Sequence, residues 1–258
     1  MLLTGKLGVI FGVANKRSIA WACAEAAAAQ GARLVLTYQG ERLAEGVREL
    51  AATLPHRAIA LPCDVASDTS IDQFFHQLRD HFAHVDFAVH SIAYAKTEEL
   101  EGEYVKTSRD GFHLAQDVSC YSLTALAQRL VPLMERSHHG GSLVTMTYVG
   151  GERVVPGYNV MGVAKAALES SMRYLAADLG PRRIRVNAVS AGPLRTLAAS
   201  AIDDFGEMLD LHKDRAPLRR NIKASEVAEA TVFLLSDMAR GITGQVLHVD
   251  GGFHIMAL

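Results

Sequence analysis

The stretch YNVMGVAK places a phenol, Tyr158, seven residues before an ammonium group, Lys165. If this stretch is helical, seven residues make nearly two turns, so both side chains would lie on one face, about 10 Å apart along the axis. A phenol can donate a hydrogen bond to an oxygen on which negative charge develops, and a nearby lysine can add positive potential. The same pattern also fits an amphipathic helix with a snorkelling lysine, so other parts of the chain must decide between the two.

A turn rich in small and polar residues follows the first apolar run and reads GVANKRSI. Gly12 permits a tight backbone turn, and Ser18 can cap a helix that begins near Ile19. The amide groups at such a helix N-terminus can bind a pyrophosphate. The usual three-glycine spacing, G-x3-G-x-G, is absent because Lys16 and Ser18 stand at the later positions. The turn predicts a dinucleotide site, with a plain serine-capped helix as the alternative.

Polar residues also close the second, third and fourth apolar runs. Gln39 stands where a dinucleotide fold selective for NAD usually has an acid. Its amide can bind a ribose hydroxyl, and Arg42 is the one nearby candidate cation for a 2′-phosphate, so NADH is favoured over NADPH. The other residues expected beside the adenine and the dinucleotide are Asp64 and Val65 in CDV, with a routine turn aspartate as the alternative, and Ser91 and Ile92 in HSI.

Short apolar runs alternate with longer stretches of helical periodicity along the chain. The apolar runs lie at 7–12, 32–38, 57–65, 85–91, 141–148, 184–190 and 245–251. The helical stretches lie at 18–31, 41–53, 70–82, about 109–136, about 159–179 and 225–237. Such alternation builds a parallel sheet with helices on both faces. We therefore predict an α/β fold: a single domain, 1–258, that is doubly wound and Rossmann-like, with a mostly parallel seven-stranded sheet.

The composition narrows the possible partners. The 258 residues are 49% hydrophobic and 21% charged, which suits one compact domain. The net charge of −2 gives no electrostatic reason to expect nucleic acid or an anionic membrane as the main partner. Cys23, Cys63 and Cys120 fit neither a disulfide framework nor a zinc spacing, so we expect a reducing cytoplasm. The histidines lack metal-ligand spacing, and we expect no metal, signal peptide or membrane span.

An ordered set of motifs covers the chain from Gly5 to the C-terminal HVDGGF. The motifs are G-x5-S-I from Gly12, YQ at 38–39, CDV at 63–65, HSI at 90–92, Tyr148, Y-x6-K at 158–165, SAGPLRTLAA at 190–199 and HVDGGF at 248–253. Together they resemble the bacterial enoyl-acyl-carrier-protein reductases, the NADH-linked divergent branch of the short-chain dehydrogenase/reductases. The resemblance implies reduction of the trans-2 double bond of enoyl thioesters in the fatty-acid elongation cycle.

The resemblance also assigns residues to this chemistry. Hydride addition to the carbon β to the thioester carbonyl leaves an enolate oxygen that needs hydrogen-bond donors. The implied catalytic residues are Tyr148, Tyr158, which would donate to that oxygen, and Lys165, which would hold the nicotinamide ribose. The implied NADH contacts are Gly12, Ser18, Ile19, Gln39, Asp64, Val65, Ser91, Ile92, Lys165, Leu194, Arg195, Thr196, Leu197 and Ala198. The implied substrate contacts are Ala95, Tyr148, Tyr158, Met161, Phe205 and Met208, the last two on a helix in the segment from about 191 to 215.

Two alternatives remain open. An ordinary short-chain carbonyl or alcohol oxidoreductase has a serine 13 residues before its tyrosine, and Thr145 stands at that offset from Tyr158. A binding scaffold without catalysis would fit the missing glycines, although the retained Tyr148, Tyr158 and Lys165 argue against it.

The family resemblance implies two partners, the acyl carrier protein and further copies of this chain in a homotetramer. The helix that carries basic residues in familiar members has Asp203, Gly206 and Glu207 here, so carrier docking on that helix is in doubt. A basic cluster follows at Lys213, Arg215, Arg219, Arg220 and Lys223, where a solvated charged face is the alternative to docking. Ala93 is a further departure, since familiar members have glycine at that position.

Overall fold

The computed structural model describes residues 1–196 and 205–257. Seven strands form one sheet in the order β3-β2-β1-β4-β5-β6-β7, and every pairing between neighbours is parallel. The strands are β1 (Leu7–Phe11), β2 (Arg33–Tyr38), β3 (Ile59–Pro62), β4 (Phe87–His90), β5 (Gly141–Thr147), β6 (Ile184–Ala191) and β7 (Val246–Val249). The predicted doubly wound α/β fold is confirmed. The strand order reverses between β1 and β4, and a ligand of this fold binds beyond the carboxyl ends of the strands there.

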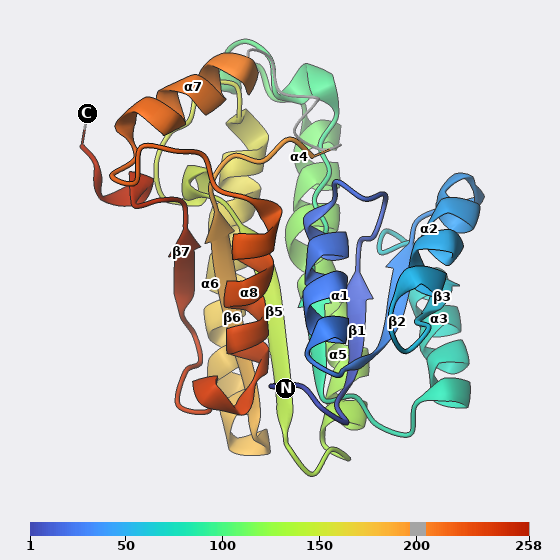
Figure 1. Cartoon of the computed structure of the whole chain (residues 1–258). Coiled ribbons are helices and arrows are strands. Elements are labelled where there is room, and N and C mark those ends of the chain that lie inside the picture. The colour runs from blue at the N-terminus through green and yellow to red at the C-terminus, as the bar shows by residue number, and fades with distance from the viewer. Residues whose placement is uncertain (197–204, 258) are drawn as a thin grey trace.

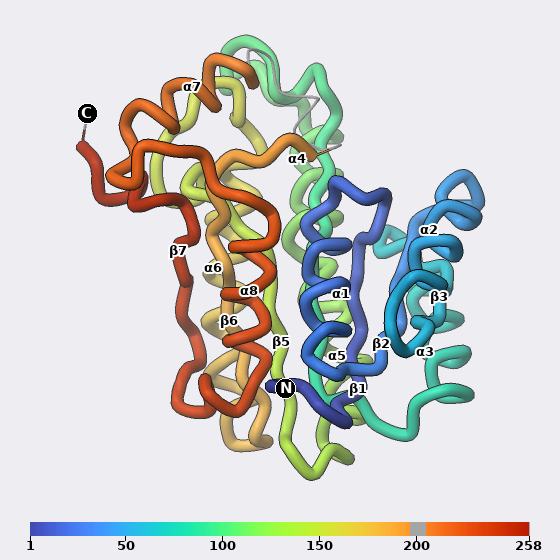
Figure 2. Tube along the Cα trace, viewed as in Figure 1, coloured from blue at the N-terminus to red at the C-terminus, as the bar shows by residue number. Residues whose placement is uncertain are grey.

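Helices cover both faces of the sheet (Figure 1). The helices α1 (Ile19–Ala29), α2 (Glu41–Thr53) and α8 (Ala224–Leu235) contribute to the apolar core on one face. The core on the other face includes α3 (Asp68–His81), α5 (Ser122–Met134) and α6 (Asn159–Leu179). The helix α7 (Phe205–Arg215) lies beyond the carboxyl ends of the strands, at the top of the view, and the traced chain ends beside it (Figure 2). In the described ranges, no helix has both the length and the apolar character needed to cross a membrane.

The long helical stretch expected at about 109–136 is divided into three parts. The helix α4 (Arg109–Gln116) passes into a π-helical turn at Asp117–Tyr121 before α5 begins. Ser119, fully buried in this turn, accepts a hydrogen bond from Tyr94 N at 2.9 Å, and its hydroxyl lies 3.1 Å from Tyr94 O. π-Bulges of this kind often occur at functional sites. The turn therefore ties the helix to the segment that follows β4.

The helix that carries Lys165 begins one residue after the tyrosine. Tyr158 is the N-cap residue of α6, and Asn159 has a left-handed backbone with φ of +34°. Asparagine tolerates this conformation better than most residues. Its side-chain amide donates to the carbonyls of Leu100, Glu101 and Gly102 at 3.0, 3.4 and 3.2 Å. Tyr158 thus precedes the helix instead of sharing a helical face with Lys165.

Candidate active site

Two tyrosine rings meet at the carboxyl end of β5. Tyr148 directly follows this strand, and its ring centroid lies 5.1 Å from that of Tyr158 in an edge-to-face arrangement. Gly150 leaves room for the Tyr158 ring, because a Cβ there would lie 2.5 Å from the ring atom Cδ1. Tyr148 Oη lies 3.6 Å from Met208 Sδ, which connects the pair to α7. A ligand bound at this site would therefore contact two neighbouring phenols.

Burial strengthens the preference of both phenols for the protonated form. It raises the pKa of Tyr148 to about 12, with the negative charge of Asp250 adding to the effect. Burial raises the pKa of Tyr158 further, and the neighbouring Tyr148 contributes. Desolvation has this direction because it penalises the charged phenolate. At neutral pH both hydroxyl groups are hydrogen-bond donors.

Lys165 lies in the second turn of α6 and is 5% exposed. Its Nζ donates to Met146 O in β5 at 2.8 Å. Burial lowers the pKa of Lys165 to about 8, while the negative charge of Glu169, one turn further along α6, opposes the shift. Glu169 accepts a hydrogen bond from Thr147 Oγ1 at 2.6 Å, and burial raises its own pKa. Lys165 therefore retains most of its charge at pH 7 in the free protein.

Thr145 is engaged elsewhere in the fold. Ser122 Oγ donates its hydrogen bond to Val118 O at 2.6 Å. Ser122 Oγ therefore accepts a hydrogen bond from His90 Nε2, which lies 2.9 Å away. His90 Nδ1 then accepts from the hydroxyl of Thr145 at 2.8 Å. Burial, with the positive charge of Lys165 adding to it, lowers the pKa of His90 to about 3 and keeps the ring neutral.

This arrangement decides what Thr145 can do. Its side chain is fully buried, and its hydroxyl is hydrogen-bonded to His90 Nδ1. This hydroxyl is therefore not available to bind a substrate oxygen beside Tyr158. In an ordinary carbonyl reductase, the serine at this position binds that oxygen.

The first turn fits a pyrophosphate. Gly12 has φ of +93°, and a Cβ at this position would lie 2.3 Å from Ser91 O and 3.0 Å from Ile92 Cγ1. Ser18 caps α1 by accepting from Trp21 N at 3.3 Å. The first turn of α1 carries no acidic residue. Backbone amides at a helix N-terminus, beside a turn that only glycine can make, suit a bound diphosphate.

The adenosine end of the predicted site is formed by the residues after β2 and β3. Gln39 Nε2 donates to Asp64 Oδ1 at 3.1 Å, and Val65 is buried beside them in the core of the second face. The structure thus brings Gln39 and Asp64 together and places Gly12 against Ser91 and Ile92, as a continuous dinucleotide site requires.

The predicted acyl site is only partly described. Ala95, Tyr158 and Met161 belong to one small apolar cluster with Leu100, and Met208 reaches it through Tyr148. Phe205 is the first residue of α7, one turn before Met208. Leu194 packs against the core, and Arg195 and Thr196 follow it along the chain. Leu197, Ala198 and Asp203 lie outside the described residues.

Sequence reasoning gave no role to three residues at this site. These are His90, Ser119 and Glu169, all buried. His90 belongs to the HSI motif, which predicted that it lies at the end of a strand. The motif did not predict its contact with Thr145. In the part of the chain that the structure describes, no three His, Cys, Asp or Glu side chains gather where a metal ion could bind.

Comparisons with known proteins agree with this geometry. The family model for enoyl-(acyl carrier protein) reductase matches residues 12–254. An NADH-dependent enoyl-acyl-carrier-protein reductase of Bacillus subtilis is 54% identical over 99% of this chain and 98% of its own length. Among solved structures, the Bacillus cereus reductase with NADP⁺ and an indole naphthyridinone has a TM-score of 0.97 and 51% identity, covering 100% of this chain and 99% of its own. The Anaplasma phagocytophilum reductase with NAD has a TM-score of 0.95 and 48% identity, covering 100% and 97%. The chain therefore belongs to the enoyl-acyl-carrier-protein reductase family, as its motifs predicted.

Proposed function

We propose that the protein reduces the trans-2 double bond of enoyl-acyl-carrier-protein thioesters with NADH in the fatty-acid elongation cycle. The observation that carries this proposal is the pair of protonated phenols at Tyr148 and Tyr158, together with the buried Lys165, while Thr145 is bonded to His90. The relatives are named as NADH-dependent enoyl-acyl-carrier-protein reductases, and this supports the proposal.

The residues divide the work as follows. When bound, NADH supplies the hydride that adds to the carbon β to the thioester carbonyl. The Tyr158 hydroxyl donates a hydrogen bond to the thioester oxygen, which becomes the enolate oxygen. The ring of Tyr148 packs edge to face against the ring of Tyr158 and supports it. Such a donor contributes most where the charge develops, in the transition state. Lys165 holds the nicotinamide ribose hydroxyls and adds positive potential.

The cofactor would lie along the carboxyl edge of the sheet. The α1 N-terminus and Gly12 would hold its pyrophosphate, and Gln39, Asp64 and Val65 its adenosine. Ser91, Ile92 and the segment from Leu194 to Ala198 would complete the site. The acyl chain would lie among Ala95, Met161, Phe205 and Met208, so the segment from about 191 to 215 would serve substrate binding within the catalytic domain.

Partners and location complete the proposal. The carrier protein would meet the basic residues in the last turn of α7 and after it, rather than the acidic first turn of α7, which contains Glu207. Among these basic residues, Arg220 is ion-paired with Glu226. We further propose a homotetramer, and a cytoplasmic location in keeping with the free, buried Cys23, Cys63 and Cys120.

The test is NADH oxidation with crotonyl and dodecenoyl thioesters, run beside a panel of ketones. We expect turnover with the thioesters only. Thr145→Val should change enoyl turnover by less than about tenfold, because the lost hydroxyl bonds to His90 and not to substrate. Turnover of ketones, with a larger loss in Thr145→Val, would favour the carbonyl reductase. Failure of the wild-type protein to bind NADH, followed by nicotinamide fluorescence, would favour a scaffold.

A further inference from the structure

One hydrogen bond joins the two loops at the adenosine end of the site. Gln39 Nε2 lies 3.1 Å from Asp64 Oδ1. A carboxylate can only accept hydrogen bonds, so the amide nitrogen of Gln39 must be the atom that faces it. The bond therefore fixes which end of the amide points away from Asp64. The carbonyl oxygen Oε1, an acceptor, is left for a ligand beyond β2.

The carboxylate of Asp64 is oriented by its own loop rather than by Gln39. Its Oδ1 also accepts from Ala66 N at 3.1 Å, and its backbone amide donates to Ser70 Oγ in α3 at 2.9 Å. Gln39, by contrast, is exposed and is held by no other side chain of the described residues. Asp64 thus positions Gln39, and not the reverse.

The surroundings of Gln39 would otherwise tolerate an extra phosphate. The helix α2 begins directly after Gly40, its N-cap, which has no side-chain cap. The exposed Arg42 lies in the first turn, next to the single acid Glu41. Helix N-termini and arginine both attract anions. An acceptor presented by Gln39 would oppose this attraction for a 2′-phosphate.

We propose that Asp64 is a positioning residue for cofactor selectivity: by holding the Gln39 amide nitrogen, it presents Gln39 Oε1 to the adenosine ribose. That oxygen accepts a hydrogen bond from a 2′-hydroxyl and repels a 2′-phosphate. This inference rests on the proposed NADH-dependent function and explains how the same site selects its cofactor. Without the bond, the amide can rotate and offer its N–H groups to a phosphate instead.

The test measures binding, not turnover. The dissociation constants of NADH and NADPH are obtained by titration of nicotinamide fluorescence, and their ratio, NADPH over NADH, is compared among variants. The adenine is common to both cofactors, so a loss of adenine contacts in an Asp64 variant cancels in the ratio. Asp64→Ala should lower the ratio about tenfold, the size of one lost charge-assisted hydrogen bond.

Two further variants separate positioning from direct repulsion by the Asp64 charge. Asp64→Asn keeps an acceptor oxygen for the Gln39 amide but removes the charge, so it should keep most of the wild-type ratio. In a Gln39→Met background, Asp64→Ala should leave the ratio unchanged, because the residue through which Asp64 acts is gone. Asp80→Ala, an exposed charge at the far end of α3, is the matched control and should not alter the ratio.

Three results would overturn the inference. These are an unchanged ratio in Asp64→Ala, an equal fall in Asp64→Asn, or a fall that persists in the Gln39→Met background. All of them presuppose that the wild-type protein binds NADH. Absence of binding to either cofactor would instead contradict the proposed function itself.

Discussion

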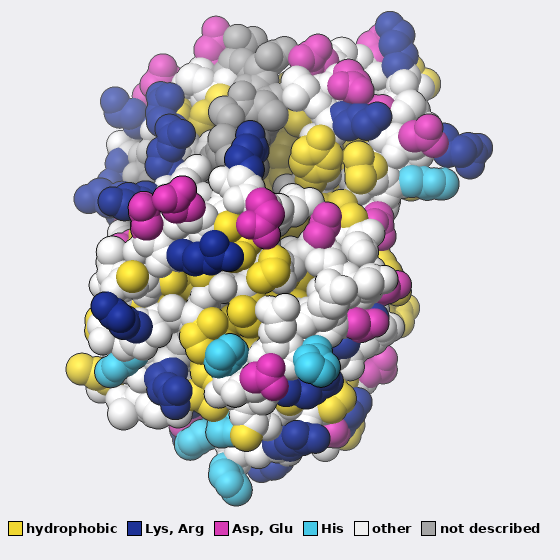
Figure 3. Space-filling view, turned by 90° about the vertical axis from the view of Figure 1, so that its right-hand side faces the viewer, with side chains coloured by type: hydrophobic (Ala, Val, Ile, Leu, Met, Phe, Trp, Pro, Cys, Tyr) yellow, Lys and Arg dark blue, Asp and Glu magenta, His cyan; other side chains and the backbone are white. Residues whose placement is uncertain are grey.

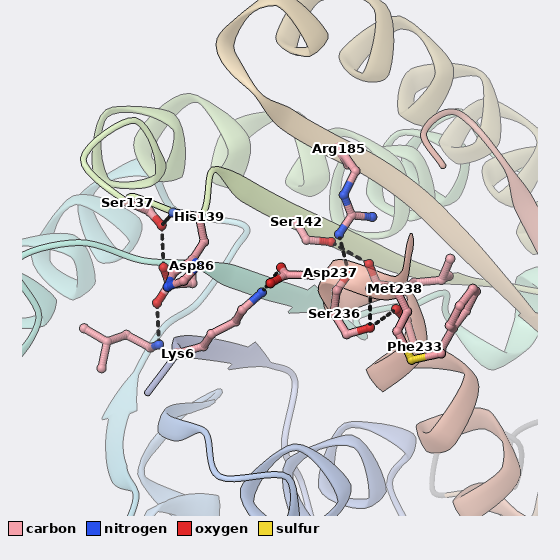
Figure 4. Close-up of polar contacts among 12 residues, drawn as sticks. Lys6, Asp86, Ser137, His139, Ser142, Arg185, Phe233, Ser236, Asp237 and Met238 are labelled. Carbon is pink, nitrogen blue, oxygen red and sulfur yellow. Dashed lines mark hydrogen bonds and ion pairs between the residues drawn. The ribbon is translucent and has the colours of Figure 1, made fainter. Parts of the chain in front are cut away.

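The two ends of the parallel sheet use buried polar groups in opposite ways. At the amino end, polar side chains bind one another (Figure 4). Buried Asp86 accepts from Leu7 N at 2.6 Å and from the Ser137 hydroxyl, and Lys6 Nζ lies 2.6 Å from Asp237. A hollow of about 390 Å³ opens at this end, lined in part by these already paired groups.

At the carboxyl end, some buried polar groups are paired, such as His90 with Thr145, but Lys165 and Tyr158 keep hydrogen-bond donors that no described residue uses. Lys165 Nζ donates to one carbonyl, and no described residue forms a hydrogen bond with Tyr158 Oη. The pKa shifts differ accordingly. The hydrogen bond from Lys6 lowers the pKa of Asp237, whereas burial raises the pKa of the tyrosines and lowers that of Lys165. Shifts caused by burial, in groups that also have unused donors, are typical of functional sites. One end stabilises the fold, and the other is arranged for a ligand.

The largest effect on activity is expected for Lys165→Ala. It would remove both the proposed hydrogen bonds to the nicotinamide ribose and a buried positive charge, so we expect kcat/KM to fall about 10³- to 10⁴-fold. The dissociation constant of NADH should rise together with the loss of rate. Fluorescence titration and steady-state kinetics measure the two. A normal NADH affinity in a variant that keeps the wild-type melting temperature would show that Lys165 does not bind the ribose.

Tyr158→Phe should lower kcat by about 10²- to 10³-fold with NADH affinity nearly unchanged, because its hydrogen bond strengthens chiefly in the transition state. Tyr148 or a water molecule would reduce this loss if it took over the hydrogen bond. The exposed Tyr104 offers a control, Tyr104→Phe, which should have wild-type kinetics. Wild-type enoyl turnover in the Tyr148→Phe, Tyr158→Phe double variant would show that neither phenol stabilises the enolate.

The pH dependence of NADH binding should report Lys165. Its pKa of about 8 means that the free protein loses this charge as pH rises through that value. NADH affinity should therefore be constant below about pH 7 and weaken above pH 8, by up to about tenfold for each pH unit. Titrations between pH 6 and pH 9.5 measure the profile. The inflection should be absent in Lys165→Met; its persistence there would assign it to another group.

The smallest effect on activity is expected at the amino end. Asp86→Asn weakens the contacts with Leu7 N and Ser137, which should cost about 1–3 kcal/mol and lower the melting temperature by several degrees. The kcat/KM for enoyl thioesters at 25 °C should stay within about twofold of the wild-type value. Thermal unfolding and kinetics on the same preparation test this. A large loss of turnover without a loss of stability would contradict the separation of the two ends.

The sequence predicted the elements and the positions of most candidate residues because apolar periodicity and short motifs are local. Every expected strand forms within a few residues of its predicted range, and Ser18 caps α1 as expected. The π-helical turn at Asp117–Tyr121 was not predicted, since helical periodicity continues through it and Ser119 finds its partner in a distant segment. The contacts of Thr145 with His90 and of Gln39 with Asp64 join neighbouring strands. Local sequence patterns do not show such partners.

Asn159 mechanically couples the loop after β4 to Tyr158. Its side-chain amide bonds to three successive carbonyls at 100–102, and the residue before it, Tyr158, packs against the apolar cluster that contains Leu100. The loop after β4 and the Tyr158 side chain are therefore both anchored at Asn159. We therefore expect that a ligand which displaces this loop also changes the direction of the Tyr158 hydroxyl. We expect Asn159 to tolerate substitution poorly, because a replacement must both accept a left-handed backbone and donate hydrogen bonds to these carbonyls.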